Sequence, residues 1–344
     1  MTTLRPAVKS GRQFQNPVDT KMAGFALLPK ILKLYVKNKE ERFPRQAPGP
    51  FRTDARAYDH APASGLRVTW IGHSGMLMEI DGMNVLVDPV WDKRASPVSW
   101  IGPKRFFDAP LPLEKLPGID VVLVSHDHYD HLGKQTVRKL ARLQSLSGAR
   151  WVTSLCVGKY LRGFGVNKVK IVELDWTESF TVSNQNNSAK LDITALPARH
   201  FSGRGLFDRF ATLWSSFVLK GNRHNIYFGA DSGLWEGFAE IGKQYGPFDL
   251  TMLEIGAFNE LWKSIHMGPD GAVDAFKLMG ATGLLMPIHW GLFNLALHAW
   301  RQPIERITEL ADRTGIKLWS PTPGTPTEVI AGQEFRSDWW RSKS

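Results

Sequence analysis

Short apolar segments recur along the chain from residue 66 onward, and their lengths and spacing predict mostly β-strands. Residues 66–71, 76–80 and 84–88 form the first three, and the Asp81-Gly82 pair between the second and third predicts a hairpin turn. The continuous apolar run at residues 121–124 predicts a buried strand. The core of the protein is therefore expected to begin near Leu66 with a β-sheet.

Later segments alternate between helical and strand-like spacing. Residues 135–146, 271–279 and 303–314 have the apolar spacing of helices. Strand-like runs lie at residues 151–153, 170–172, 191–194, 216–219, 225–228, 250–253 and 283–286. Hairpin-rich and βα-rich parts follow one another without a regular repeat, which predicts a layered α/β fold and excludes a regular barrel or solenoid.

Residues 1–65 differ in composition and are expected to form an N-terminal extension to a domain of residues 66–344. They are rich in Lys, Arg, Pro and Ala and contain one apolar island at residues 23–36. A helix there would carry an apolar face and a basic face, formed by Ile31, Leu34 and Tyr35 and by Lys30, Lys33 and Lys37. Such a helix would either pack against the main body or lie on an anionic membrane, and the sequence leaves both open.

Composition narrows the classes of partner and of metal site. The net charge of +10 and a pI of about 9.6 suggest an anionic partner such as a phosphate ester, an acidic lipid surface or a nucleic acid. The single cysteine, Cys156, excludes an intrachain disulfide and a thiolate zinc site, so nitrogen and oxygen ligands would hold any metal. The sequence shows neither a secretory signal nor an apolar run of about 20 residues. We expect a cytoplasmic protein, at most peripheral to the inner face of a membrane.

The segment just past the predicted strand at residues 121–124 is a candidate metal site. Residues 126–131 read His-Asp-His-Tyr-Asp-His, and such a loop would open from the carboxyl end of a sheet strand. His126 and His128 are spaced to grip one ion, and Asp130 and His131 point to a second. Three more metal-capable residues follow apolar runs, namely His200, Asp231 and His289. Together they predict a binuclear metallohydrolase, since paired ions share a hydroxide nucleophile.

At these residues the sequence resembles the metallo-β-lactamase superfamily of binuclear hydrolases, whose His-x-His-x-Asp-His motif residues 126–131 match. Within it the chain is most similar to N-acylphosphatidylethanolamine-hydrolysing phospholipase D and its bacterial relatives. The similar segments are residues 69–73, 94–97, 102–105, 125–132, 173–176, 229–233, 246–250 and 288–291. The resemblance covers about four-fifths of the chain and depends on the order and spacing of these segments.

The resemblance implies a four-layer αββα sandwich with two zinc ions at one edge, although other divalent metals remain open. His126, His128 and His200 would hold the first ion, Asp130, His131 and His289 the second, and Asp231 would bridge both. Asp88, which ends a predicted strand, would either accept a hydrogen bond from a ligand imidazole or cap the following turn. His73 is interpreted as a structural residue beside the site.

The same resemblance implies a phosphodiesterase of the phospholipase D type. A hydroxide bridging the metals would attack phosphorus, with Asp130 orienting it as well as binding metal. Tyr129 and His266 match positions that contact the substrate head group, and His266 would also assist the phosphoryl oxygen or the departing alcohol. The context of His266, Ile-His-Met-Gly-Pro-Asp, departs slightly from the family's His-x-Asp-Pro pattern. A homodimer is the expected assembly on the same grounds.

Several functions remain open. Lactonases and small-molecule phosphodiesterases have almost the same ligands on this fold. A ribonuclease Z-like nuclease is a second alternative, but no clustered basic stripe follows Leu66, which disfavours nucleic acid as a partner. A non-catalytic metal protein is disfavoured because no ligand is missing, and a di-iron protein would typically have Glu at position 128. An apolar groove for acyl chains is one interpretation of the aromatic residues near these motifs, which are Trp100, Phe106, Phe107, Phe201, Phe207, Trp214, Phe258, Trp262, Trp290 and Phe293.

Overall fold

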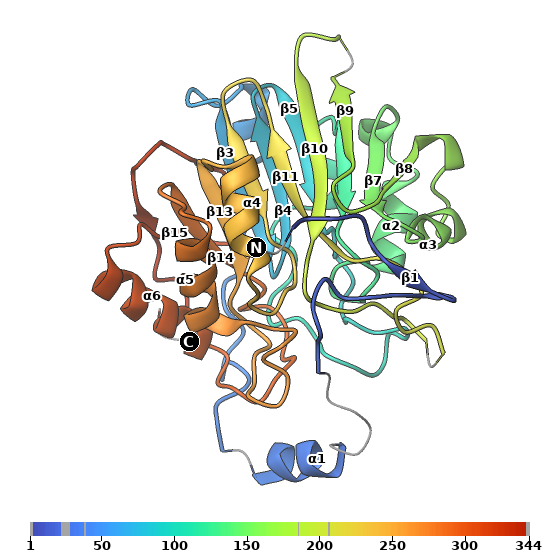
Figure 1. Ribbon diagram of the computed structural model, residues 1–344. Helices are drawn as coiled ribbons and strands as arrows, with labels where there is room; N and C mark the ends of the chain where they lie inside the picture. Colours follow the sequence, from blue (N-terminus) through green and yellow to red (C-terminus); the bar gives the residue numbers. More distant parts are fainter. Residues whose placement is uncertain (1–2, 22–27, 38, 185, 206, 342–344) are drawn as a thin grey trace.

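Two mixed β-sheets lie face to face, and helices cover their outer surfaces (Figure 1). The computed structural model describes residues 3–21, 28–37, 39–184, 186–205 and 207–341 of the 344-residue chain. The expected αββα sandwich is therefore confirmed.

The first sheet has seven strands in the order β16-β3-β4-β5-β6-β7-β8. Their bounds are Thr327–Glu328, Leu66–Gly72, Gly75–Ile80, Met83–Val87, Val121–Val124, Arg150–Ser154 and Ile171–Leu174. Strands β3, β4 and β5 pair antiparallel, and β5 to β8 pair parallel. The carboxyl ends of the parallel strands therefore meet at one edge of the sheet.

The second sheet has six strands in the order β14-β13-β12-β11-β10-β9. Their bounds are Leu284–Ile288, Leu250–Glu254, Asn225–Phe228, Ser215–Lys220, Lys190–Pro197 and Ser179–Ser183. Strands β12, β13 and β14 are parallel, and the others are antiparallel. This sheet brings the carboxyl ends of three parallel strands together, as the first sheet does with four.

Helices on the two outer faces complete the four layers. The first sheet carries α2 (Lys134–Leu140) and α3 (Gly158–Gly163), and the second carries α4 (Gly237–Tyr245), α5 (Gly268–Leu278) and α6 (Gln302–Thr314). Single 3-10 turns lie at Ala55–Asp59, Leu113–Lys115, Gln144–Leu146 and Lys168–Lys170. Two small sheets join β1 (Lys9–Ser10) with β2 (Gln13–Phe14) and β15 (Trp319–Ser320) with β17 (Phe335–Arg336).

Alternation of side chains along the strands builds the core. In β5, Val85 and Val87 belong to the apolar cluster that includes Phe217 of the opposite sheet, whereas Leu86 between them packs with Leu140 of α2. A strand with both faces covered has apolar residues at successive positions, which explains the continuous apolar runs in the sequence. The cores between the layers thus fix the register of each strand.

Most expected elements are present, with some shifts. The predicted helix at residues 135–146 is divided, because α2 ends at Leu140 and a separate 3-10 turn follows at Gln144–Leu146. The apolar pattern of the sequence did not predict α3, α4 or β9. Strand β9 is an edge strand with the polar sequence Ser-Phe-Thr-Val-Ser, and α4 contains two glycines, so neither has a strong apolar pattern.

The N-terminal extension has two described parts with different surroundings. In residues 3–21, Leu4 and Phe14 are buried against the main body. Helix α1 (Leu28–Lys37) overlaps the predicted apolar island of residues 23–36, and its described side chains, including Leu34, Tyr35 and Val36, are exposed. Figure 1 shows α1 set apart from the two sheets. The first part of the island, residues 22–27, lies outside the described residues. Within the described part of the chain, no helix has the length and apolar character needed to cross a membrane.

Candidate metal centre

The carboxyl ends of strands from both sheets deliver the candidate ligands to one place. Residues 126–131 follow β6, Asp231 follows β12, and His289 follows β14. His200 comes after β10, on a segment without regular secondary structure. Because these strand ends meet at one edge of the sandwich, residues up to 163 positions apart form one cluster.

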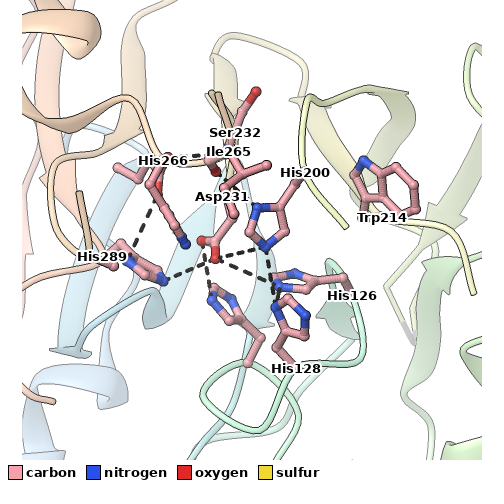
Figure 2. A network of polar contacts seen from close by, with 12 residues as sticks. His126, His128, His200, Trp214, Asp231, Ser232, Ile265, His266 and His289 are labelled. Atoms are coloured by element: carbon pink, nitrogen blue, oxygen red, sulfur yellow. Dashed lines mark hydrogen bonds and ion pairs between the residues drawn. The ribbon is translucent and has the colours of Figure 1, made fainter. Parts of the chain in front are cut away.

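His126, His128, His200 and Asp231 form the first group of donor atoms that lie close enough to hold one ion. Nδ1 of His128 lies 2.9 Å from Nε2 of His126 and 3.2 Å from Nε2 of His200. Oδ2 of Asp231 lies 3.5 Å from Nε2 of His200 and 3.8 Å from Nε2 of His126. Figure 2 shows these three rings converging on one side of the Asp231 carboxylate.

The second group contains Asp130, His131 and His289, with His73 beside them. Nε2 of His289 lies 3.4 Å from Oδ2 of Asp130, and Nε2 of His131 lies 3.6 Å from the same oxygen. The Asp231 carboxylate faces this group too, since Oδ1 lies 3.2 Å from His131 Nε2 and Oδ2 lies 3.1 Å from His289 Nε2. Asp231 therefore lies between the two groups, as the bridging role requires.

The buried polar atoms of the cluster fit divalent ions. Nε2 of His131, Nε2 of His289 and Oδ1 of Asp231 are buried and make no hydrogen bond within the described part of the chain, despite the short distances above. Burial of polar atoms without partners costs free energy, so an ion bound between these nitrogen and oxygen atoms would supply the partner that the protein does not. The set of imidazole nitrogens and carboxylate oxygens suits zinc and similar divalent metals.

Hydrogen bonds connect Asp88 to one histidine of each group. It follows β5 and is fully buried, and its Oδ2 accepts hydrogen bonds from Nδ1 of His131 at 2.7 Å and from the Ser125 hydroxyl at 2.7 Å. Ser125 Oγ in turn lies 2.9 Å from Nδ1 of His126. The expected hydrogen bond to Asp88 is therefore present, and it comes from His131, a candidate ligand. The Asp88 carboxylate therefore orients His131 directly, and it orients His126 through the Ser125 hydroxyl.

Charge is divided unevenly between the two groups. Burial lowers the pKa of His126, His128 and His200, so these imidazoles are neutral. Burial alone would also lower the pKa of His289, but the carboxylates of Asp231 and Asp130 raise it to about 10. Asp231, Asp130 and Asp88 likewise raise the pKa of His131 well above its ordinary value against the effect of burial. A metal ion in the second group would therefore displace protons.

Strained backbone is concentrated at the site. Residues other than glycine with positive φ there include His73 at 59°, Asp88 at 39°, Ala230 at 48° and His289 at 62°. Such conformations cost about 1–3 kcal/mol each and persist where the surroundings enforce them, commonly at functional sites. At Gly256 an added Cβ would lie 1.8 Å from the carbonyl oxygen of His289, so the loop after β13 can approach that residue only with glycine.

A cavity of about 480 Å³ opens over the cluster. His128, Asp130, Asp231 and His289 form its polar floor, and its walls include Phe201, Trp262, Ile265, Leu295 and the cationic Arg209. Tyr129 and His266, the two expected substrate contacts, both line it. The Tyr129 hydroxyl, however, donates to the carbonyl of Arg204 at 2.6 Å, so it is already engaged in the protein.

Two further residues lie near the cluster: Glu254, which was not identified from the sequence, and His73, which was interpreted as a structural residue beside the site. Glu254 ends β13, is fully buried, and accepts a hydrogen bond from Nδ1 of His266 at 2.6 Å. His73 lies with Nε2 2.9 Å from Oδ2 of Asp130, and burial together with His289 lowers its pKa to about 3. Each follows or ends an apolar strand, the same signal that identified Asp231 and His289.

The aromatic residues expected to form an acyl groove have different surroundings. Phe201 and Trp262 line the cavity. Phe107, Trp214, Trp290 and Phe293 are instead buried in the apolar cores, and Trp100 and Phe207 are exposed. The apolar wall of the cavity therefore depends on a smaller set of side chains than the sequence suggested.

Comparisons with known proteins agree with this architecture. Residues 83–290 match a family model described as a beta-lactamase superfamily domain. An uncharacterised protein of Mycobacterium tuberculosis is 43% identical over 300 residues, which cover 87% of this chain and 76% of that protein. N-acyl-phosphatidylethanolamine-hydrolyzing phospholipase D 1 of Caenorhabditis elegans is 35% identical over 318 residues, which cover 89% of this chain and 88% of that protein.

Solved structures show the same fold. An isothiocyanate hydrolase from Delia radicum gut bacteria matches with a TM-score of 0.59 and 19% identity, over 76% of this chain and 99% of that one. A metallo hydrolase from Ignicoccus hospitalis matches with a TM-score of 0.56 and 21% identity, over 79% of this chain and 99% of that one. At these identities the similarity shows the fold and leaves the substrate undetermined.

Proposed function

Because this chain belongs to the metallo-β-lactamase superfamily and is a metal-dependent hydrolase of that fold, we propose that it is a zinc-dependent phosphodiesterase of the phospholipase D type. Its proposed substrates are phospholipids that resemble N-acylphosphatidylethanolamine. The observation that carries the proposal is the convergence of two donor groups, sharing Asp231, on the floor of a cavity with an apolar wall. The sequence similarity to the nematode phospholipase supports the choice of substrate class.

In this proposal the two groups each hold one zinc ion. His126, His128 and His200 would hold the first ion and Asp130, His131 and His289 the second, and Asp231 faces both groups. Zinc ions bound there supply Lewis acidity that activates water and stabilises negative charge on a phosphodiester. Asp88 keeps Nε2 of His131 directed at the site by accepting from Nδ1, which fixes the tautomer of a ligand.

The residues around the cavity orient the substrate. His266 lines the cavity, and its hydrogen bond from Nδ1 to Glu254 leaves Nε2 to face the substrate. We assign His266 to a phosphoryl oxygen or to the departing alcohol, whose oxygen needs a proton when its bond to phosphorus breaks. Arg209 brings a positive charge to the same cavity, which suits an anionic phosphate. Tyr129, which also lines the cavity, would contact the head group.

A phospholipid substrate also suits the exposed α1. Its described side chains include the apolar Leu34, Tyr35 and Val36, the last 80% exposed, together with exposed Lys30, Lys33 and Lys37. A helix of this kind lies on anionic membranes with its apolar face in the headgroup region. Co-sedimentation with phosphatidylserine vesicles tests this contact, and Leu34→Asp combined with Tyr35→Asp should abolish it. Equal sedimentation of this variant and the wild type would refute it.

The direct test is a substrate comparison with purified protein. We expect N-acylphosphatidylethanolamine vesicles to yield a fatty acyl ethanolamide and phosphatidic acid, and bis-nitrophenyl phosphate to yield nitrophenol. Ring opening of a long-chain lactone without phosphodiester cleavage would favour the lactonase alternative instead. Salt-sensitive binding and cleavage of transfer RNA would favour the nuclease.

A further inference from the structure

A segment of the N-terminal extension contacts the backbone of a candidate metal ligand. The side-chain amide of Asn16 donates from Nδ2 to the carbonyl oxygen of His200 at 2.8 Å, and its Oδ1 accepts from the His200 N–H at 2.9 Å. The two residues are 184 positions apart. Asn16 thus pairs with both backbone polar groups of His200 in the way that a neighbouring strand would.

This pairing compensates for the local structure of His200. The residue is fully buried, but it lies three positions after the end of β10 and outside any ladder of backbone hydrogen bonds. A buried N–H and C=O need partners, and leaving each without one costs about 1–3 kcal/mol. Asn16 supplies both, so the position of this ligand depends on a residue outside the catalytic core.

Residues 19–21, which follow Asn16, make hydrogen bonds to the loop that carries His200 and to the loop that carries His266. Asp19 and Thr20 accept hydrogen bonds from the Arg199 guanidinium, through the Asp19 carbonyl and the Thr20 hydroxyl, each at 3.0 Å. The Lys21 carbonyl accepts from the hydroxyl of Ser264 at 2.5 Å, on the loop that carries His266. Residues 16–21, which we name the strap, therefore join the His200 loop to the His266 loop.

The two loops are also joined directly at the candidate ligand. Nδ1 of His200 lies 3.0 Å from the carbonyl oxygen of Ile265, the residue between Ser264 and His266. This contact directs Nε2 of His200 toward Asp231 and His128. The ring of His200 is therefore oriented by a carbonyl whose loop the strap holds.

Apolar packing anchors the strap upstream. Phe14 is buried in a cluster with Trp176, Leu213 and Trp214, and its N–H donates to the carbonyl of Phe210 at 2.8 Å. The Ala7 N–H donates to the Asp175 carboxylate at 3.0 Å. Burial of a phenylalanine contributes about 1.5–3 kcal/mol, enough to hold the preceding hairpin and hence Asn16 in place.

From these contacts we propose that Asn16 is a positioning residue for the metal ligand His200, and that the strap is a structural part of the metal centre. This inference rests on the proposed function, in which His200 binds the first zinc ion. Partners that orient ligands typically change metal affinity by about 10- to 100-fold when they are lost. The first ion should therefore depend on Asn16, and the second, held by Asp130, His131 and His289, should not.

The test is metal titration of the full-length chain after metal removal, with zinc and with cobalt as a spectroscopic probe. Asn16→Leu keeps the approximate volume of the side chain and removes both hydrogen bonds. The matched control is Gln15→Ala, which removes an exposed amide from the neighbouring position. Circular dichroism confirms that each variant is folded before its affinities are compared.

We expect two equivalents of metal in the wild type and in Gln15→Ala. In Asn16→Leu one equivalent should bind about 10- to 100-fold more weakly while the other keeps its affinity. A purely structural role would lower the stability of the metal-free protein and leave both affinities of the folded protein unchanged, and that result would overturn the proposal.

A second variant covers the case in which Asn16→Leu fails to fold. Asn16→Asp retains the acceptor for the His200 N–H but places an oxygen against the His200 carbonyl, so it should also weaken one equivalent. Wild-type binding by this variant would overturn the role of Asn16 while the proposed function stands. A wild-type protein that binds no metal would overturn both.

Discussion

The substitution Asp88→Asn tests how the protein orients its candidate ligands. Asp88 Oδ1 accepts from the Ser125 N–H at 2.8 Å, and Oδ2 accepts from the Ser125 hydroxyl and from Nδ1 of His131. An asparagine has the same shape but only one acceptor oxygen. Whichever way its amide turns, an NH₂ group faces a donor that the carboxylate had accepted.

The two orientations of the amide have different consequences. With NH₂ toward His131, the ring must accept at Nδ1 and carry its proton on Nε2, the atom that would bind metal. With NH₂ toward the Ser125 N–H, a buried backbone donor loses its partner at a cost of about 1–3 kcal/mol. Either result should weaken metal binding by about 10- to 100-fold, which corresponds to about 1.4–2.7 kcal/mol.

Both metal groups should respond, because Ser125 connects Asp88 to His126 of the first group. The assay is zinc titration of the metal-free protein against a chromophoric chelator, with circular dichroism as the check on folding. Asp92→Asn is the matched control, since Asp92 accepts from Gln135 and Thr136 at the start of α2 and is not a neighbour of a candidate ligand. Two equivalents bound by Asp88→Asn with wild-type affinity would refute the reasoning.

Three further results are expected. Asp130→Ala should abolish phosphodiester turnover while the fold is kept, and near-wild-type activity measured with bis-nitrophenyl phosphate would reject the assignment of Asp130. His266→Ala should lower kcat by about 100-fold or more, because a phosphoryl oxygen or the departing alcohol loses its partner, and a kcat near that of the wild type would reject the role of His266. The pKa of His289 is raised from 6.5 to about 10 in the metal-free protein, against the effect of burial, by the Asp231 and Asp130 carboxylates. The contribution of protonated His289 to stability is thus complete below about pH 6.5 and is lost as pH rises through about 10. Zinc must displace this proton, so it should bind more tightly as pH rises. Thermal unfolding of the metal-free protein checks the first trend, zinc titrations between about pH 6 and 9 check the second, and a zinc affinity independent of pH would contradict the reasoning.

The sequence predicted the parts of the fold that depend on local pattern. Strands covered on both faces need apolar residues at successive positions, so runs such as residues 121–124 were identified with correct bounds. The same pattern placed His126, Asp231 and His289 at strand ends, and the topology of the sheets brings those ends together. Elements with weak apolar spacing, such as the edge strand β9, were not identified.

Contacts between distant segments could not be predicted from local pattern. Asn16 and His200 are 184 positions apart, and nothing in the sequence around Asn16 marks it as the partner of a ligand. The engagement of the Tyr129 hydroxyl by the Arg204 carbonyl, 75 positions away, is equally hidden. Glu254 could have been found, since it ends an apolar strand in the same way as the residues that were identified.

The metal content of the protein purified without added zinc tests the central claim most directly. The seven residues from two sheets should hold two equivalents of divalent metal per chain, measured by inductively coupled plasma mass spectrometry after exhaustive dialysis. Asp231→Ala should lose affinity for both equivalents, because Asp231 faces both groups. A wild-type chain that retains no metal and binds none on titration, or an Asp231→Ala variant that keeps both equivalents, would contradict the account.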